Sequence, residues 1–314
     1  MRRINAREYL QHYFGGIVAK RGNSATPKLP EAARLMVPVM AATGGSGRST
    51  VANLLACGLA LSGRTAVLDT GPRLSSPWPA WTHGQPVQGL SSLPSDRPLS
   101  RALVRQAAAQ RPGLAAETSW QVLTDAREWH SAPLSLPQDP AAWHQLAAIG
   151  GWQSVVADTS HPVAHDVLAA RCEDRVGLTR GWCNLPFAIP VLCAAATASG
   201  VQALQQAVMA MHAEGLPLQR TVAVLVSSSD GRPPAVVRAG ATMLDPRVSA
   251  VVQLPHDPSI RAHGLREPSR LRSRTRQAAT ALADAVLAAA HSTWGEPLPH
   301  APRPRPLSPS VPTF

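Results

Sequence analysis

Short apolar runs alternate with segments of helical periodicity through most of the chain. Seven runs predict buried strands, at residues 35–41, 64–69, 119–124, 153–158, 189–196, 221–227 and 248–254. Helical spacing of apolar residues predicts helices at about 48–62, 99–111, 140–149, 200–213 and 275–291. Strands joined by helices form βαβ units, in which the strands run parallel. The pattern therefore predicts an α/β fold with one doubly wound, mostly parallel sheet and helices on both faces.

The same pattern divides the chain into three parts. Residues 1–34 form a basic leader, and residues 35–294 contain the predicted strands and helices. Residues 295–314 carry seven prolines, and we expect them to be disordered or extended. A chain of 314 residues is long enough for one large α/β domain plus such tails.

Charge and cysteine content restrict the partners and the compartment. The net charge of +11 indicates an anionic partner, although arginine carries nearly all of it and such a composition is also typical of GC-rich genomes. The four cysteines lack CxxC or Cys/His metal spacing. No run approaches the ~18 apolar residues of a membrane helix, and no signal-peptide region follows the first residues. We expect a cytoplasmic protein without a transmembrane segment.

The most informative segment is a glycine-rich turn between the first predicted strand and the first predicted helix. It contains Thr43, Gly44, Gly45, Ser46, Gly47, Arg48, Ser49 and Thr50. Glycines here let backbone N–H groups surround a phosphate, and the helix N-terminus adds partial positive charge. Arg48 can reach the terminal phosphates, and the Ser49 hydroxyl is placed to bind Mg²⁺. The alternative is a tight strand–helix turn that needs glycine only for its geometry.

From this turn onward the chain resembles the ParA/MinD family of deviant Walker A, SIMIBI-class P-loop ATPases, whose loop runs KGGxGK[ST]. VVADTS at 155–160 resembles the family's strand that ends in Asp-Thr-Pro-Pro, and IPVLCAAATASGVQAL at 189–204 resembles the strand and helix that follow. VAVLVSSSDG at 222–231 lies where the family has a strand followed by Asn. VVQLPHDPSIRAHG at 251–264 resembles its closing Ile-Pro-x-Asp segment. The resemblance covers roughly residues 35–290 and implies the family's fold.

The resemblance also implies a nucleotide site for ATP or ADP with Mg²⁺. The nucleotide would be bound by the residues of the glycine-rich turn, Thr43 to Thr50, and by Pro255 near the adenine. Mg²⁺ would be held by Ser49, Asp69 and Asp158, partly through water. Asp69 and Asp158 are also the candidates for a catalytic role.

Three departures from the family pattern bear on hydrolysis. The signature lysine that crosses the dimer interface aligns with Thr43, the phosphate-binding lysine with Arg48, and the second acid of an Asp-x-Asp motif with Gly71. A positioned cation can be worth about 10³-fold in the rate of phosphoryl transfer. We therefore expect nucleotide binding with weak or absent hydrolysis. A competent ATPase and a site that binds no nucleotide are the alternatives.

An arginine-rich segment, residues 261–276, is a candidate for binding DNA. It holds six arginines against one acid, and such a cluster can neutralise DNA phosphates without reading sequence. ParA-like proteins use a basic surface in their C-terminal half in this way. If the chain after Pro268 is helical, Arg270 and Arg274 share a face. The DNA-binding candidates are Arg266, Arg270, Arg272, Arg274 and Arg276; the alternative is a solvated arginine-rich loop.

Several other segments carry candidate chemistry or docking surfaces. The leader has an interrupted apolar stripe that could dock on a partner protein, the alternative being a loosely ordered segment; the stripe contains Leu10, Tyr13, Phe14 and Ile17. Trp78 and Trp81 form either a docking patch or part of the buried sheet edge. We interpret His161, His165 and Asp166 as polar surface rather than a metal cluster.

The sequence therefore predicts a ParA/MinD-like nucleotide-binding switch that positions or partitions DNA or a protein complex, including a role in chromosome partitioning. We expect a homodimer that recognises a partner protein through the leader or the Pro-rich tail. The alternative is a catalytically inactive adaptor of a secretion, pilus or conjugation apparatus.

Overall fold

The computed structural model describes residues 28–87, 89–94, 96–266 and 268–304. The apolar stripe of the leader and the end of the Pro-rich tail lie outside the described residues. Each of the seven predicted strands overlaps an observed one. The strands are β1 Leu35–Ala41, β2 Thr65–Asp69, β3 Ala109–Pro112, β4 Ser119–Leu123, β5 Ser154–Pro162, β6 Val191–Ala195, β7 Val222–Val226 and β8 Ala250–Leu254.

Helices fill most of the connections, and the described part of the chain has some that the periodicity did not predict. The helices that it did not predict are α6 Val163–Cys172, α7 Leu178–Cys183 and α9 Ala235–Leu244, together with the short α3 Trp78–Thr82 and α10 Pro258–His263. The helices are α2 Arg48–Leu59, α3 Trp78–Thr82, α4 Arg101–Ala107, α5 Pro140–Gly150, α6 Val163–Cys172, α7 Leu178–Cys183, α8 Ala198–Ala213, α9 Ala235–Leu244, α10 Pro258–His263 and α11 Ser273–Trp294.

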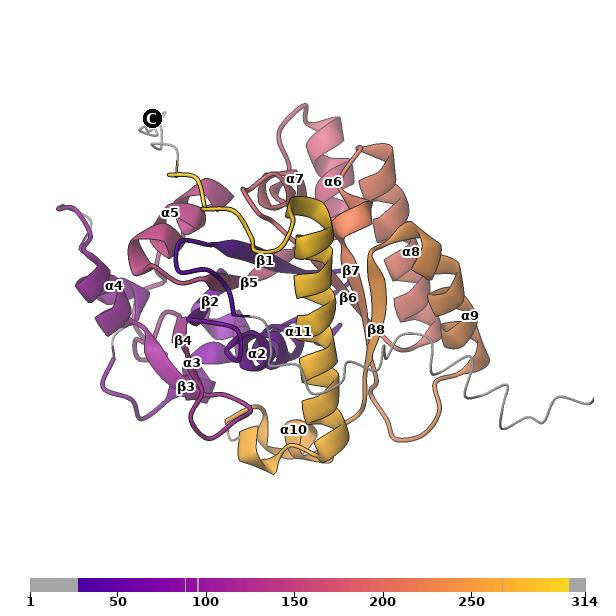
Figure 1. Cartoon of the computed structure of the whole chain (residues 1–314), viewed down its shortest axis with the longest axis horizontal. Coiled ribbons are helices and arrows are strands. Elements are labelled where there is room, and N and C mark those ends of the chain that lie inside the picture. The colour runs from indigo at the N-terminus through magenta and orange to yellow at the C-terminus, as the bar shows by residue number, and fades with distance from the viewer. Residues whose placement is uncertain (1–27, 88, 95, 267, 305–314) are drawn as a thin grey trace, which may run out of the picture.

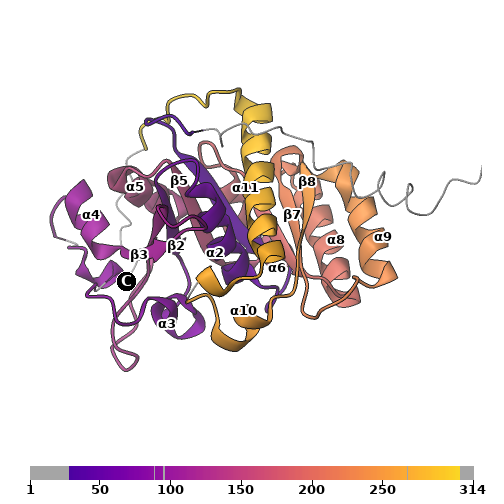
Figure 2. The same cartoon turned by 60° about the horizontal axis from the view of Figure 1, so that its bottom comes forward.

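The strands form one eight-stranded sheet in the order β3-β4-β2-β5-β1-β6-β7-β8. Neighbouring strands are parallel except at one edge, where β3 runs antiparallel to β4. Helices cover both faces, with α2 and α11 on one face and α8 and α9 on the other (Figures 1 and 2). The predicted doubly wound α/β sheet is confirmed.

The edge strand β3 corrects one prediction. A helix was expected over residues 99–111, but α4 ends at Ala107 and the chain then turns into β3. Side chains along β3 alternate between buried and exposed, with Ala109 and Arg111 buried and Gln110 and Pro112 exposed. Proline has no backbone N–H to donate to a neighbouring strand, so a strand that contains one fits at the edge of a sheet, where one side has no neighbour.

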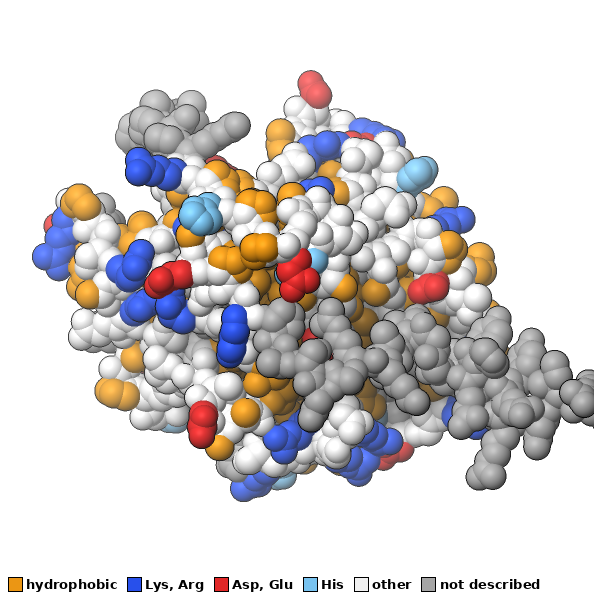
Figure 3. All heavy atoms as spheres, viewed as in Figure 1, with side chains coloured by type: hydrophobic (Ala, Val, Ile, Leu, Met, Phe, Trp, Pro, Cys, Tyr) orange, Lys and Arg blue, Asp and Glu red, His pale blue; other side chains and the backbone are white. Residues whose placement is uncertain are grey.

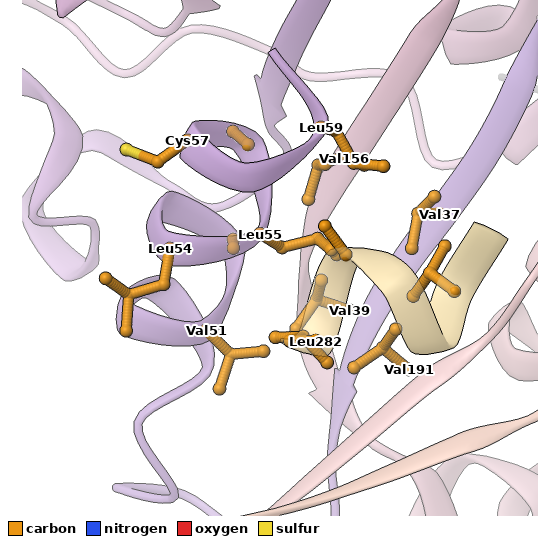
Figure 4. Close-up of a cluster of buried hydrophobic side chains, with 14 of the residues drawn as sticks. Val37, Val39, Val51, Leu54, Leu55, Cys57, Leu59, Val156, Val191 and Leu282 are labelled. Atoms are coloured by element: carbon orange, nitrogen blue, oxygen red, sulfur yellow. The ribbon is translucent and has the colours of Figure 1, made fainter. Parts of the chain in front are cut away.

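The central strand β1 is buried on both faces, which explains its continuous apolar run. Val39 faces the layer of α2 and α11, where it lies in one apolar cluster with Leu55 and Leu282 (Figure 4). Met40, one residue further, belongs to the cluster on the opposite face, with α8. Both helix layers therefore fix the position of β1 and of the turn that follows it.

Residues on either side of the main body also pack against it. Leu29 and Leu298 are buried, and the Ala301 amide donates to the Ala32 carbonyl at 2.9 Å. Parts of the predicted leader and tail thus contribute to the fold. None of the helices in the described ranges is long and apolar enough to cross a membrane.

Close packing between α2 and α11 depends on Gly58. A Cβ atom at this position would lie 2.7 Å from the Ala279 carbonyl oxygen and 2.7 Å from the Ala283 Cβ. We predict that Gly58→Ala lowers the free energy of unfolding by about 1–3 kcal/mol, measured by urea denaturation, because overpacking outweighs the better helix propensity of alanine. Adding Ala283→Gly should recover part of the loss, and an increase in stability for Gly58→Ala alone would contradict the packing.

Candidate functional site

The glycine-rich turn between β1 and α2 forms an open cradle. Gly45 and Gly47 have φ angles of 72° and 79°, in the left-handed region that glycine adopts without strain. A Cβ atom at Gly44 or Gly45 would meet no atom within 4 Å, so space lies in front of the loop. The buried Ser46 hydroxyl donates to the Thr43 carbonyl at 2.8 Å and holds the loop in shape. The turn therefore has the room and the backbone conformation that a bound phosphate needs.

The first turn of α2 adds donors to this cradle. Its N-cap, Gly47, has no side chain with which to satisfy the first amides, and the first turn contains no acidic residue. Ser49 and Thr50 are half-buried, and their hydroxyls have no hydrogen-bond partner among the described residues. Amides and hydroxyls at an uncapped N-terminus attract an anion. The residues present fit a polyphosphate.

Arg48, the cation of the predicted site, is paired with a buried carboxylate. Its Nε atom donates to Oδ1 of Asp158 at 2.8 Å. The side chain of Asp158 is 3% exposed and that of Arg48 is 24% exposed. The other oxygen of Asp158 accepts a hydrogen bond from the indole Nε1 of Trp78 at 2.7 Å. Both carboxylate oxygens therefore already have protein donors.

Asp69 ends β2 directly beside Asp158, its register partner on β5. It accepts hydrogen bonds from the hydroxyls of Thr124 at 2.6 Å and Ser76 at 2.7 Å, and from the Gly71 amide at 3.2 Å. Burial raises the pKa of Asp69 from 3.8 to about 7; the negative charge of Asp158 adds to this rise, and the three hydrogen bonds oppose it. A fraction of Asp69 is therefore protonated at neutral pH.

These contacts bear on the predicted Mg²⁺ site. Mg²⁺ takes oxygen ligands in octahedral geometry and keeps several waters. The two oxygens of Asp69 and the two of Asp158 each accept a hydrogen bond from the protein, and both residues are buried. In this arrangement the carboxylates do not fit a metal or its waters. Ser49 keeps a free hydroxyl, and the assignment of Mg²⁺ to this site stays a prediction.

The sequence analysis did not identify Trp78 as part of this site. Trp78 is fully buried at the start of α3, and its ring contacts Trp81 edge-on at 5.1 Å and Trp120 at 6.0 Å between ring centroids. Of the two interpretations of this tryptophan, burial is confirmed. Its only signal in the sequence was a large apolar residue soon after the acid that ends β2.

His161 and Asp166 correct another interpretation. His165 is exposed as expected, but His161 and Asp166 are buried, and Asp166 accepts hydrogen bonds from the Leu178 and Thr179 amides at 3.0 and 2.7 Å. Burial lowers the pKa of His161 to about 4. The positive charge of Arg48 lowers this pKa further, and the negative charge of Asp166 raises it. The interpretation of His161 as a surface residue was wrong because β5 continues past Asp158 to Pro162 and includes this histidine. Asp166 lies in the following helix, α6. The described residues contain no cluster suited to a metal ion.

The predicted adenine segment lies at the same edge of the sheet. A Cβ atom on Gly47 would approach Val226 of β7 to 3.0 Å, and Val226 pairs with Leu254 at the end of β8. Pro255 follows directly and is half-buried. The turn follows β1 and Pro255 follows β8, so both lie at the carboxyl edge of the sheet, where doubly wound folds bind ligands; β6 and β7 lie between the two strands.

The DNA-binding candidates are not equivalent in the structure. Arg272 and Arg274 form ion pairs with Asp230, and Arg276 donates to the Leu114 carbonyl at 2.6 Å. Arg266 and Arg270 are exposed and line a cavity of about 430 Å³ beside Trp81 and α10. Figure 3 shows basic side chains gathered at the edge formed by α10 and the start of α11.

One expectation about these arginines is wrong. Arg270 ends a short 3₁₀ turn and α11 begins only at Ser273, so Arg270 and Arg274 do not share a helix face. Asp257 explains the break, because it accepts from the Ser259 and Arg272 amides at 2.9 and 3.0 Å and so caps α10 and the start of α11. The DNA surface itself stays a prediction.

Comparison with solved structures confirms the fold. No protein-family model matches the chain, and no curated protein matches its sequence. The structure is similar to a chain of the MinC:MinD cell division protein complex from Aquifex aeolicus, with a TM-score of 0.54, 12% identity and coverage of 81% of this chain and 96% of that chain. It is also similar to a ParA family ATPase from Chlorobium tepidum (TM-score 0.52, 14% identity, 81% and 99% covered) and to apo McdA from Cyanthece (0.50, 14%, 81% and 99%). The chain has the ParA/MinD P-loop fold.

The Arg48–Asp158 ion pair should contribute measurably to stability. We predict that Arg48→Ala lowers the free energy of unfolding by about 3 kcal/mol, because it leaves a buried carboxylate without its charge partner. Urea denaturation would measure the loss. Combining Arg48→Ala with Asp158→Asn should restore most of it, since the buried charge is then gone. Equal stability of the single variant and the wild type would contradict a stabilising pair.

Asp69 should give the stability a distinctive pH dependence. Because its pKa is 3.8 unperturbed and about 7 in the fold, the folded protein holds a proton that the unfolded chain has lost across this window. Relative to Asp69→Asn, the wild type should therefore lose stability as the pH rises from about 4 to 7, by more than about 1 kcal/mol. Thermal unfolding of both proteins across this range would test it. The stability difference between the wild type and Asp96→Asn, which changes an exposed carboxyl, should show no such trend.

Proposed function

We propose that this chain is a nucleotide-binding switch protein that takes the phosphates of ATP or ADP at residues 43–50 and hydrolyses ATP slowly or not at all. The observation that carries the proposal is the open cradle of the turn at the uncapped N-terminus of α2. Free space lies in front of Gly44 and Gly45, and Ser49 and Thr50 add hydroxyls without partners among the described residues. Pro255, at the edge of the same sheet, would contact the base.

Weak hydrolysis follows from what surrounds this cradle. Phosphoryl transfer is accelerated by cations and acids aimed at the transferring group. Here Thr43 replaces one cation of the family pattern, and Gly71 replaces the acid next to the attacking water. The remaining cation, Arg48, is held by Asp158. The site therefore keeps groups that bind phosphate and lacks groups that would drive its transfer.

The wider role that we propose is positioning of DNA or of a protein complex in the cytoplasm by a nucleotide-dependent homodimer. The structural neighbours include a cell division protein complex and a ParA family ATPase, which supports this role by analogy of fold. Basic side chains around α10 would supply the contact with DNA.

An apolar surface next to the site supports the homodimer. Leu74 and Trp129 are 76% and 75% exposed. The buried Arg73 joins their segments, because it pairs with Asp125 and donates to the Trp129 carbonyl at 3.2 Å. Large exposed apolar side chains held in place in this way are typical of protein contacts.

The second candidate function is a catalytically inactive adaptor that serves a secretion, pilus or conjugation apparatus through partner proteins. The observation in its favour is the Asp158 carboxylate, whose two oxygens are already bonded to Arg48 and Trp78. A site stabilised internally in this way can persist as a scaffold without nucleotide.

A charge placed in the cradle separates the two candidates. Gly44 is exposed and a side chain there would meet open space, so Gly44→Glu should leave the fold intact while its carboxylate repels a polyphosphate. We predict that ATP and ADP raise the melting temperature of the wild type by mass action and that Gly44→Glu abolishes the rise.

Met243→Glu is the matched control, since it adds the same charge at an exposed position of α9. It should keep the ligand-induced rise. A wild type whose melting temperature does not respond to either nucleotide would favour the adaptor. Absence of phosphate release from ATP by a protein that binds it would support the proposed weak hydrolysis.

A further inference from the structure

The surroundings of Asp158 carry an inference about the form of ligand that this site takes. We propose that the loop binds polyphosphate without a divalent metal ion, with the Arg48 guanidinium linking the phosphate to Asp158 and Trp78 keeping metal away from that carboxylate. The inference rests on the proposed nucleotide binding and specifies it further.

The Arg48 guanidinium keeps unused N–H donors after its contact with Asp158. Only Nε is bonded to the carboxylate, and neither Nη1 nor Nη2 donates to any described residue. The side chain is 24% exposed and belongs to the first residue of α2, next to the cradle, so a phosphate bound there would have these two groups within reach in our proposal. A guanidinium presents five N–H donors in a planar fork and can hold a carboxylate and a phosphate at the same time. A lysine ammonium, a single point charge, makes such a bridge less well.

In this proposal the Arg48 guanidinium takes the place of a metal ion, because it links the phosphate to the Asp158 carboxylate. A bound Mg²⁺ would need oxygens or waters within its octahedral shell and would reach Asp158 through one of them. Arg48 already neutralises that carboxylate at 2.8 Å, which removes its attraction for a second cation. The positive guanidinium also repels Mg²⁺ at close range.

Trp78 closes the other side of the carboxylate. Its indole Nε1 donates to Oδ2 of Asp158 at 2.7 Å, so this oxygen already has a protein donor. The side chain is fully buried, and contacts with Trp81 and Trp120 hold the ring. The Trp78 amide also donates to the Ser76 hydroxyl at 3.2 Å, which anchors the start of α3. Metal could reach Asp158 only after this packing opened.

Calorimetric titration with and without metal tests the inference. ATP and inorganic tripolyphosphate are titrated into the full-length protein, once in EDTA and once in excess Mg²⁺. For the wild type we expect weaker binding in excess Mg²⁺ than in EDTA, because Mg²⁺ forms complexes with ATP and tripolyphosphate and so competes with a site that takes the metal-free ligand. For Arg48→Lys combined with Trp78→Phe we expect binding at least about tenfold weaker in EDTA than in Mg²⁺, because the bridge is lost and Asp158 is opened to the metal.

Arg247→Lys combined with Trp294→Phe is the matched control, because Arg247 is exposed, Trp294 is half-buried at the end of α11, and no described contact joins either residue to Asp158. It should bind both ligands as the wild type does in either buffer. Trp78→Phe alone replaces the double variant if the latter does not fold, and it should gain dependence on Mg²⁺ in the same direction.

The possible results separate this inference from the proposed function. Wild-type binding that is as tight or tighter with Mg²⁺ overturns the metal-free site and leaves nucleotide binding standing. Variants that keep the wild-type preference for EDTA overturn the roles of Arg48 and Trp78. A folded wild type that binds neither ligand in either buffer overturns the proposed function and this inference together.

Discussion

The ion pair between Arg48 and Asp158 is the interaction on which the rest of the site depends. It joins the first residue of α2 to a buried residue in the middle of β5, so it ties the glycine-rich turn to the centre of the sheet. A buried carboxylate without a charge partner is costly, and Arg48 supplies that partner from the loop itself. The pair therefore neutralises the Asp158 carboxylate and occupies its Oδ1 atom. It leaves Nη1 and Nη2 of Arg48 without a described acceptor.

The sheet brings the two carboxylates together in a dry environment. β2 and β5 are parallel neighbours, and their register sets Asp69 directly beside Asp158. Burial raises the pKa of Asp69 to about 7, and the negative charge of Asp158 adds to the rise. Asp158 itself is paired with Arg48. Hydroxyls of Thr124 and Ser76 hold Asp69 in place, and Ser76 also accepts from the Trp78 amide. Loop, strand ends and α3 thus form one connected network.

This network relates the two candidate functions to a single structural feature. If a polyphosphate engages the free edge of the Arg48 guanidinium, the network connects the ligand to α3 and to the tryptophans packed on it. If no ligand binds, the same contacts stabilise an inactive scaffold. The ParA/MinD fold is common to both, since fold alone does not determine chemistry. Thr43, Arg48 and Gly71 are the positions at which this chain departs from the family pattern that it resembles.

The sequence by itself determined the α/β class, all seven predicted strands and the glycine-rich turn, because apolar periodicity and glycine act over a few neighbouring residues. It also placed Asp69 at the end of its strand, whereas Asp158, expected at the end of another, lies inside β5, which continues to Pro162. Only the tertiary structure decided what these groups contact: Arg48 meets Asp158 across 110 residues of chain, and Trp78 meets it across 80. Strand β3, the burial of His161 and the late start of α11 were likewise set by neighbours distant in sequence. Local patterns encode the conformation of a segment, whereas pairing, burial and charge neutralisation depend on which segments the fold brings together.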